Sequence, residues 1–363
     1  MNTSVVYLVF ISCFFYLISP IWANTNVGKT IAKNTTWTKE GSPYMVTEDV
    51  TILQDVTLTI KEGCTILFSQ KTQMFVEGNL EAKGDANNPI RFAGKGNASW
   101  NGLFFAKTCN DYNPSTKEGV KFDYCIFKGS YTSLNALVHA RGCQLSLSNC
   151  QFETCNTAIQ IERQSRLWLK YSTIKNCDRA ITIHNTSLAE VMHNKFLNCN
   201  SILLGGTTKF QYNTLTRFTG TGRHSGLIVW MLGGGKITIS YNEFQKFEDC
   251  VLKIYKLTHR SSVKIEKNNF RNNLINLKLS CQYYNIGNVD ISYNNFYNYR
   301  NYHVQIYGRC EDSNPVVVPI GRNYWGDSSL EDLKRATADH SQDPTLSIVI
   351  QYNTPLEEAI ELK

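Results

Sequence analysis

The sequence predicts an all-β solenoid, because a short phrase recurs at the spacing of one coil and the segments between its copies alternate like strands. The phrase, roughly an aromatic residue, Asn, any residue and Phe, occurs nine times between residues 124 and 326, at intervals of 19 to 29 residues. Such a period is typical of architectures in which each repeat stacks on the next. Most intervals hold two alternating strands, such as 180–184 and 188–193, without a segment of helical period between them.

The phrase also predicts which side chains line the inside of each coil. An inward amide at a bend satisfies backbone groups freed by the turn and the next amide above it. Six copies have Asn at this position: Asn194, Asn213, Asn242, Asn268, Asn294 and Asn323. The apolar residue two positions later should form a stacked spine, which comprises Phe127, Phe152, Ile174, Phe196, Leu215, Phe244, Phe270, Phe296 and Trp325. Cys155, Cys177 and Cys199 form a third column, which we interpret as buried thiols in preference to any pair among them.

The two ends of the solenoid need caps, because an open sheet edge promotes aggregation. Residues 43–56 should form the entry cap, preceded by a flexible arm over 24–41. Residues 328–338 predict one short helix, in which Ser329 and Asp332 have the spacing of a capping box and Leu330 and Leu333 form an apolar stripe. A last strand at 347–352 closes the domain, and residues 354–363 form a C-terminal tail.

These residues resemble the right-handed parallel β-helix, or pectin-lyase-like, superfamily over residues 42–353. Residues 55–94 are similar to the entry coils of extracellular β-helix modules, and residues 321–327 with 343–355 are similar to their closing coil. The nearest likeness is to the repeat modules of bark-beetle-type extracellular adhesion proteins. The resemblance implies a single-stranded, right-handed parallel β-helix of about ten coils, with a row of outward side chains on which polysaccharides lie.

The compartment expected from the sequence is extracellular. Residues 1–23 contain an apolar run that we interpret as a cleaved signal peptide, with no transmembrane segment after cleavage. Sequons at Asn34, Asn97 and Asn185 are candidate glycosylation sites. The net charge of +7 favours an acidic polysaccharide, or a cell-surface or matrix glycoprotein, as partner. We expect neither a nucleic-acid partner nor a cofactor.

Cysteine usage fits a secreted protein. Twelve cysteines minus Cys13 of the signal peptide leave an odd number, so at least one thiol is free or bound to another chain. Superposing successive rungs predicts two disulfides, Cys109–Cys143 and Cys281–Cys310, and makes Cys125 above Cys150 a third candidate pair. The cysteines and histidines lack the spacing of a zinc site, so we expect no metal.

Ligand binding should involve the outward neighbours of the buried residues on the first strand of each coil. This predicted ledge includes the candidate ligand-binding residues His184, Lys253, Tyr255, Lys278 and Tyr307, as well as Gln160, Glu162, Thr182, Asn276 and Gln305. The alternative interpretation is an ordinary solvated strand face. Lys253 and Lys278 are weak catalytic candidates, as a lysine base for β-elimination with Arg260 or Arg309 neutralising a uronate.

A hydrolase is disfavoured, because the ledge carries one acid, Glu162, where glycoside hydrolysis needs two facing carboxyls. His224, in a glycine-rich insertion, has no identified partner and is best interpreted as part of a structural loop. The favoured hypothesis is a secreted, non-catalytic β-helix protein that binds glycans or surface partners through the ledge. The alternative is a polysaccharide lyase acting on a uronate polymer.

Overall fold

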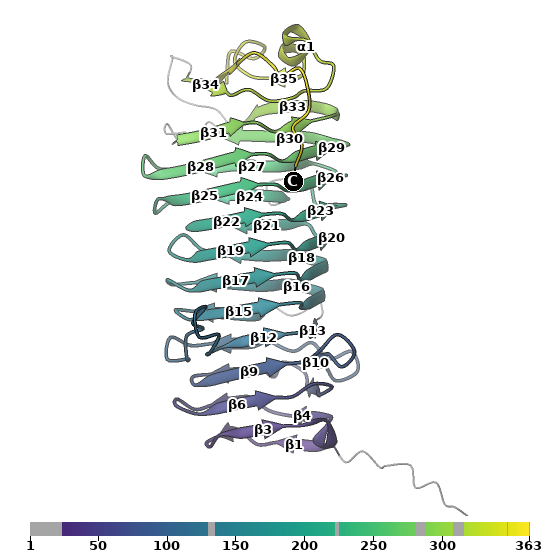
Figure 1. Cartoon of the computed structure of the whole chain (residues 1–363), viewed down its shortest axis with the longest axis vertical. Helices are drawn as coiled ribbons and strands as arrows, with labels where there is room; N and C mark the ends of the chain where they lie inside the picture. The colour runs from purple at the N-terminus through teal and green to yellow at the C-terminus, as the bar shows by residue number, and fades with distance from the viewer. Residues whose placement is uncertain are drawn as a thin grey trace, which may run out of the picture.

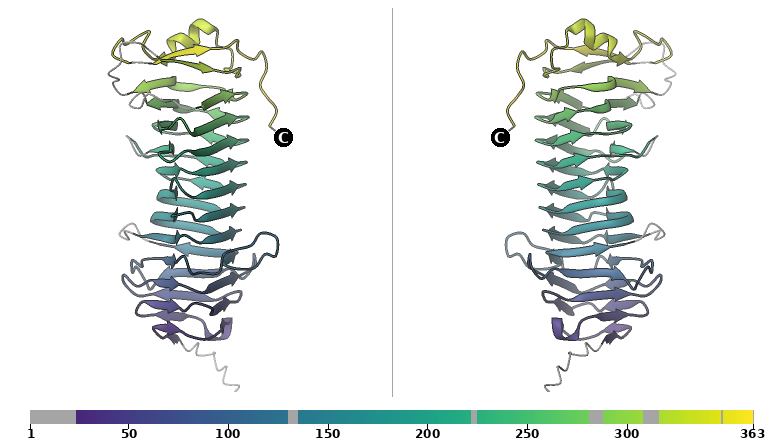
Figure 2. Two further views of the ribbon diagram at one scale, coloured as in Figure 1. Left: turned by 90° about the vertical axis from the view of Figure 1, so that its left-hand side faces the viewer. Right: turned by 90° about the vertical axis from the view of Figure 1, so that its right-hand side faces the viewer.

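The computed structural model describes residues 24–129, 135–221, 225–280, 288–307, 316–346 and 348–362. Over these residues the strands stack into one long rod, from the N-terminal coil at one end to the helix α1 (Leu330–Arg335) at the other (Figure 1). Figure 2 shows the same stacking from two further sides. The predicted solenoid of about ten coils is therefore confirmed.

Each coil passes through three columns of parallel strands. Column 1 contains β1 (Thr25–Val27), β4 (Tyr44–Val46), β7 (Thr65–Phe68), β10 (Ile90–Gly94), β13 (Cys125–Lys128), the first part of β16 (Gln151–Glu162) and of β18 (Thr173–Ile183), β20 (Lys195–Leu197), β23 (Thr214–Thr216), β26 (Glu243–Gln245), β29 (Asn269–Arg271) and β32 (Asn295–Phe296). Column 2 contains β2 (Thr30–Ile31), β5 (Val50–Ile52), β8 (Met74–Val76), β11 (Leu103–Phe105), β14 (Ala136–Arg141), the last part of β16 and β18, β21 (Ser201–Leu204), β24 (Gly226–Trp230), β27 (Cys250–Lys256), β30 (Asn273–Ser280), β33 (Tyr299–Tyr307) and β35 (Thr337–Ala338).

Column 3 is a separate sheet of eleven strands. It contains β3 (Thr35–Trp37), β6 (Thr57–Ile60), β9 (Asn79–Lys83), β12 (Lys121–Asp123), β15 (Gln144–Ser148), β17 (Arg166–Lys170), β19 (Leu188–Met192), β22 (Thr207–Gln211), β25 (Gly235–Ser240), β28 (Ser261–Glu266) and β31 (Asn288–Ser292). Beyond it, β34 (Val316–Ile320) pairs in parallel with β36 (Ile348–Tyr352), which confirms the predicted last strand.

The expectation of a flexible arm over residues 24–41 is wrong. This segment supplies β1, β2, β3 and the 3-10 helix η1 (Lys39–Gly41), and its strands pair in parallel with β4, β5 and β6. These strands are only two or three residues long and each has a single apolar residue, so they carry no periodic signal of their own. Residues 43–56, expected as the cap, belong to the second coil through β4 and β5.

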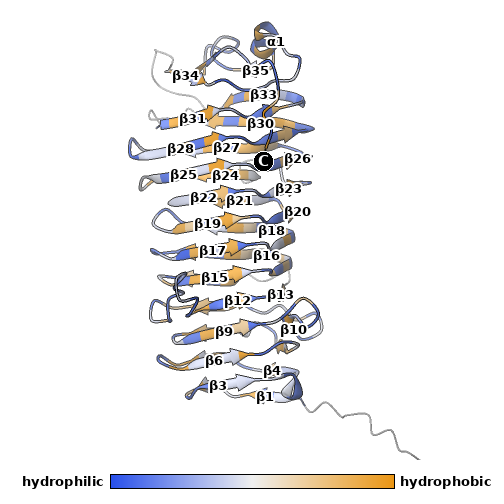
Figure 3. Ribbon diagram, viewed as in Figure 1, coloured by the Kyte–Doolittle hydropathy of each residue, from blue (hydrophilic) through white to orange (hydrophobic). Residues whose placement is uncertain are grey.

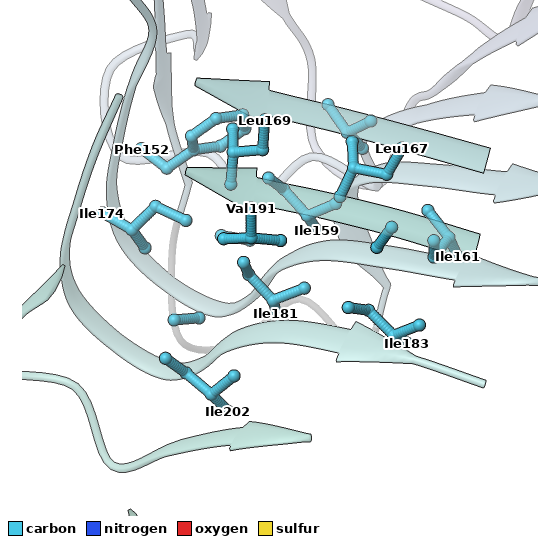
Figure 4. Close-up of a cluster of buried hydrophobic side chains, with 14 of the residues drawn as sticks. Phe152, Ile159, Ile161, Leu167, Leu169, Ile174, Ile181, Ile183, Val191 and Ile202 are labelled. Atoms are coloured by element: carbon cyan, nitrogen blue, oxygen red, sulfur yellow. The ribbon is translucent and has the colours of Figure 1, made fainter. Parts of the chain in front are cut away.

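The interior is filled by side chains that alternate along the strands of all three columns. Strand β28 shows the pattern directly, because every second residue is buried, and Figure 3 shows apolar residues along the strands of the rod. In the middle coils, Phe152, Leu169 and Ile181 reach the same interior from different strands (Figure 4). The predicted spine is confirmed by stacked rings, whose centroids lie 4.5 Å apart for Phe270 and Phe296 and 4.2 Å apart for Phe296 and Trp325.

The predicted Asn column is also confirmed, and it forms a continuous hydrogen-bonded ladder at the turn between columns 3 and 1. Asn242 is fully buried. Its Oδ1 accepts from the backbone N–H (2.9 Å) and Nδ2 (3.0 Å) of Asn213, and its Nδ2 donates to Phe210 O (2.9 Å) and to Asn268 Oδ1 (2.9 Å). The same amide-to-amide contact joins every neighbouring pair from Asn194 to Asn323.

The residue before each ladder Asn from Asn194 to Asn294 has left-handed backbone geometry, which tightens the turn. His193, Tyr212 and Tyr241 have φ of 57°, 56° and 59°. Their rings stack on the outside, with centroids 4.8 Å apart for His193–Tyr212 and 4.7 Å for Tyr212–Tyr241. Because these faces cover one another, the column stabilises the turn and offers mainly ring edges to a ligand.

The C-terminal end combines a capped helix with a tail that turns back along the rod. The capping box of Ser329 and Asp332 is present, as predicted, although the helix covers only Leu330–Arg335. Leu333 is buried, whereas Leu330 is 44% exposed, so only one side of the expected apolar stripe is covered. The tail contacts column 1, where Ile360 N donates to Asn295 Oδ1 and Asn295 Nδ2 donates to Ile360 O, each at 2.8 Å (Figure 1).

The predicted disulfide Cys109–Cys143 is confirmed, with Cα atoms 6.3 Å apart. Cys281 and Cys310 lie outside the described residues. Cys125 and Cys150 are both free and buried, so the third candidate pair is not bonded in this structure. Cys155, Cys177 and Cys199 are buried free thiols, as expected, and the sulfurs of Cys155 and Cys177 lie 3.1 Å apart.

Replacing one ladder amide should destabilise the rod strongly. Asn242→Ala removes the partners of buried groups on Asn213, Phe210 and Asn268, each of which costs roughly 1–3 kcal/mol when unsatisfied. We expect a loss of about 3 kcal/mol or more in urea unfolding. The matched control is Asn298→Ala, which removes an exposed amide bonded to Asn272 and should cost about 1 kcal/mol, because water replaces the lost partners. Equal effects of the two substitutions would contradict a stabilising ladder.

The Cys109–Cys143 bridge closes a loop with a sequence separation of 34. Replacing both cysteines by serine should therefore lower the unfolding free energy by about 3–4 kcal/mol in the chain-entropy model. Thermal melts of the variant and of the wild type measure this loss. Peptide mapping without reductant checks the pairing itself, and recovery of Cys109 or Cys143 as a free thiol would refute it.

His303 gives the fold a specific pH dependence. It is buried beside Phe296 and Trp325, and its Nδ1 lies 3.0 Å from Asn276 Nδ2. Burial lowers the pKa of His303 to about 3, below the value of about 6.5 in an unfolded chain. The unfolded chain therefore binds the extra proton first, and stability should fall as the pH drops from about 6.5 towards 3.

His303→Gln should remove this contribution. Between pH 6.5 and 4.5, wild-type protein should lose about 2–3 kcal/mol more unfolding free energy than the variant. Each pH unit between the unfolded and folded pKa values of His303 changes the unfolding free energy by up to about 1.4 kcal/mol. Urea unfolding of both proteins across this range measures the difference in slope, independently of any constant offset between them. Parallel pH profiles would show that His303 is not buried in its neutral form.

Candidate functional site

The predicted ledge corresponds to the outer side of column 2, which we call the column-2 face. Thr182, Leu203, Ile228, Lys253, Lys278 and Gln305 pair in succession across neighbouring strands. The register thus places the candidate residues Lys253 and Lys278 at equivalent positions of neighbouring strands, in line with Thr182 and Gln305. However, Leu203 and Ile228 interrupt its polar character, so the face carries two polar clusters instead of one continuous basic row.

The first cluster lies on β11, β14 and β16 and consists of Phe104, His139, Arg141 and Glu162. Glu162 Oε1 contacts Arg141 Nε at 2.7 Å and His139 Nε2 at 3.1 Å. The Phe104 ring meets the His139 ring edge to face at 5.1 Å. We call this group the Glu162 cluster.

The Glu162 cluster is close to electroneutral near pH 7. Burial lowers the pKa of His139, against the opposing pull of Glu162, so His139 is largely uncharged while Arg141 and Glu162 cancel. Glu162 is the one carboxylate in this cluster, which lacks the second facing carboxyl of a glycoside hydrolase. The predicted ligand residue His184 is exposed and directly follows β18. Strand β18 neighbours β16, which carries Glu162, and lies three strands from β27, which carries Lys253.

The second cluster contains Ser225, Asp249, Lys253 and Lys278, and we call it the Asp249 cluster. Asp249 precedes β27 and bridges both lysines, with Oδ2 at 2.6 Å from Lys253 Nζ and Oδ1 at 2.8 Å from Lys278 Nζ. Ser225 Oγ donates to Asp249 Oδ2 at 2.6 Å and accepts from Lys253 Nζ at 2.7 Å. One carboxylate therefore holds two ammonium groups from neighbouring strands.

The prediction that Lys253 and Tyr255 are exposed on the ledge is wrong. The Lys253 residue is 1% exposed and Tyr255 is 9% exposed, although both point away from the core of the coil. Lys278 keeps 19% of its side chain accessible and forms the accessible rim of the cluster. Sequence reasoning missed Asp249, because residues four apart in a strand lie about 13 Å apart, and only the turn before β27 brings Asp249 back to Lys253.

The electrostatics of the Asp249 cluster leave one positive charge in excess. Burial opposes ionisation of Asp249, but hydrogen bonds from Lys253, Lys278 and Ser225 outweigh it and lower its pKa to about 2. Two ammonium groups thus face one permanent carboxylate. A partly buried site with this balance favours an added anion, because attraction is stronger away from bulk water.

Aromatic rings flank the cluster on the same face. The rings of Tyr255 and Tyr307 meet edge to face, with their centroids 5.3 Å apart. The ring centroid of Trp230 lies 6.3 Å from that of Tyr255. Trp230 and Tyr307 are partly exposed. Burial, together with the contact to Tyr255, raises the pKa of Tyr307, so its hydroxyl stays protonated near neutral pH. Of the predicted ligand residues, the structure brings Lys253, Tyr255, Lys278 and Tyr307 into one neighbourhood and leaves His184 outside it.

The remaining candidates lie elsewhere. Arg260 is exposed on the turn before β28, whereas His224 and Arg309 lie outside the described residues. The asparagines of the three sequons lie outside the strands, with Asn34 and Asn97 exposed and Asn185 partly exposed, and glycosylation stays a prediction. Cys109, Asp111 and Cys143 lie close together, but their two sulfurs are joined in the disulfide and offer no thiolate to a metal.

Comparisons with known proteins agree with this architecture. Residues 87–229 match a family model described as a right handed beta helix region. The searches of curated proteins and of solved structures gave no match. In the described part of the chain, no helix has the length and apolar character needed to cross a bilayer. The family match over these residues and the stacked parallel coils both support a right-handed parallel β-helix as the fold of this chain.

Proposed function

We propose that this protein is a secreted, non-catalytic β-helix that binds an acidic polysaccharide at the Asp249 cluster. The observation that carries the proposal is the excess positive charge of Lys253 and Lys278 over Asp249, beside Trp230 and Tyr307. Lys278 at the rim supplies a cation to a carboxylate or sulfate, while aromatic edges and faces contact the sugar ring. The apparent signal peptide, the disulfide and the sequons support secretion.

The same geometry disfavours the lyase. A lysine base must offer a neutral amine, yet each ammonium group of this cluster is held by Asp249 within 2.8 Å. Loss of either proton would break an ion pair that is shielded from water. Asp249 itself is permanently ionised and cannot donate a proton in neutral solution. The cluster is therefore suited to holding an anion and not to transferring protons.

Removing the rim charge should weaken binding with little effect on folding. In Lys278→Met, the pair of Asp249 and Lys253 remains and the cluster becomes neutral, so affinity for alginate or heparin should fall at least fivefold in 0.15 M salt. The matched control is Lys209→Met on the outer side of column 3, where the side chain is 61% exposed. Titration calorimetry with both polymers measures the affinities, and thermal melts verify that both variants fold.

An assay for unsaturated uronate tests the alternative directly. Wild-type protein should produce no rise in absorbance near the unsaturated uronate band with alginate, pectate or glycosaminoglycans, with or without calcium. A rise that disappears in Lys278→Met would establish the lyase and overturn the non-catalytic proposal. Equal affinities of wild-type protein, Lys278→Met and Lys209→Met would instead remove the Asp249 cluster from the binding site.

A further inference from the structure

A second basic site lies at the corner between columns 1 and 2. The turn residues here have left-handed backbone geometry on successive coils, with φ of 59° at both Arg217 and Lys246. Backbone hydrogen bonds from Arg217 N to Gln245 O and from Lys246 N to Arg271 O place them at equivalent positions of neighbouring coils. Their side chains therefore repeat along the rod at the coil spacing of about 4.8 Å.

This corner is hollowed by a cavity of about 420 Å³, which we call the corner hollow. Three cationic residues line it, Arg217, Lys246 and Arg300, together with Glu248 and the amides of Asn198 and Asn272. Arg217, Lys246 and Arg300 are exposed. Arg300 Nη2 donates to Phe247 O at 3.1 Å, which anchors the guanidinium and leaves its other donors for further contacts.

The positive charges of the corner hollow are only partly compensated within the part of the chain that the structure describes. None of its three cations forms a salt bridge there. On the neighbouring outer face of column 1, by contrast, Lys175 pairs with Glu153 at 3.0 Å and Arg271 with Glu243 at 3.1 Å. Three cations against Glu248 leave two positive charges in excess. Like charges one coil apart repel, and bound oxyanions would relieve that repulsion.

The corner hollow is continuous along the chain with the Asp249 cluster. Glu248 lines the hollow, and the next residue is Asp249, which directly precedes β27. The two sites therefore lie on adjoining sides of the same coil. Their combined excess of positive charge forms one basic region that passes from the corner to the column-2 face.

We propose that the corner hollow binds a row of oxyanion groups carried on an extended polymer that runs parallel to the rod axis. The planar forks of Arg217 and Arg300 suit carboxylate or sulfate oxygens, and Lys246 adds a point charge one coil from Arg217. This inference shares its ligand class with the proposed function but rests on different residues. Carboxylates of a uronan and sulfates of a glycosaminoglycan offer the same chemistry, and the experiment separates them.

The test compares two variants that each lose two positive charges. The corner variant, Arg217→Gln/Lys246→Gln, removes two cations from the corner hollow. The column-3 variant, Arg166→Gln/Lys209→Gln, removes two cations from the outer side of column 3. Alginate presents carboxylates alone, and heparin presents sulfates as well. Affinities in 0.15 M salt, and the salt concentration that elutes each protein from immobilised polymer, provide the two measurements. Thermal melts confirm that both variants fold.

We expect the corner variant to bind at least one polymer ten times more weakly than the column-3 variant and to elute at lower salt. A loss with heparin alone assigns sulfate as the ligand group, and a loss with alginate assigns carboxylate.

Equal affinities of the two variants, or absence of binding by wild-type protein in 0.05 M salt, would overturn the proposal. If Lys278→Met binds normally while the corner variant fails, the proposed function is wrong and the corner hollow is still a binding site. The reverse result would eliminate the corner hollow alone.

Discussion

The hydrogen-bonded stack of amides from Asn194 to Asn323 is the constraint on which the rest of the rod depends. Each amide fixes the turn of its own coil and bonds to the amide of the next, so a shift of one residue would break contacts on both sides. This ties every following strand to the same register. The aromatic spine and the outward rows of columns 1 and 2 are aligned as a result, because alternation then places equivalent residues above one another.

That alignment also generates the two basic sites. Lys253 and Lys278 come together because β27 and β30 pair in register, and Arg217 and Lys246 stack because their turns occupy equivalent positions. The two pairs differ in environment. Asp249 neutralises part of the first pair and keeps it largely buried, whereas the second pair lies open to solvent. The first suits a single well-positioned anion, and the second suits an extended polyanion whose attraction is sensitive to salt.

The sequence was sufficient for the fold because its strongest signals are periodic. Phrases such as Tyr241–Phe244 repeat once per coil, so they predict both the stack and its buried residues. The segment 24–41 was missed because its strands are too short to show a period, and they are fixed by pairing with the next coil. The Cys109–Cys143 pair was found for a related reason, since equal offsets on successive rungs place the two residues side by side.

The candidate sites were predicted less completely, because alternation gives the direction of a side chain but not what covers it. Lys253 points outward as expected, yet Ser225 and Asp249 enclose it. Neither residue belongs to the repeated phrase, and both approach from turns whose paths the sequence does not specify. The corner hollow was missed for the same reason, since it arises from stacked turn residues and not from alternating strands.

The most direct measurement is a crystal structure of the protein with a short anionic oligosaccharide from the polymer that binds more tightly. The account predicts density for a carboxylate or sulfate beside Lys278 Nζ, with a sugar ring near Tyr307 and further oxyanions towards Arg217. Density confined to the outer side of column 3, or to the stacked rings of Tyr212 and Tyr241, would contradict it.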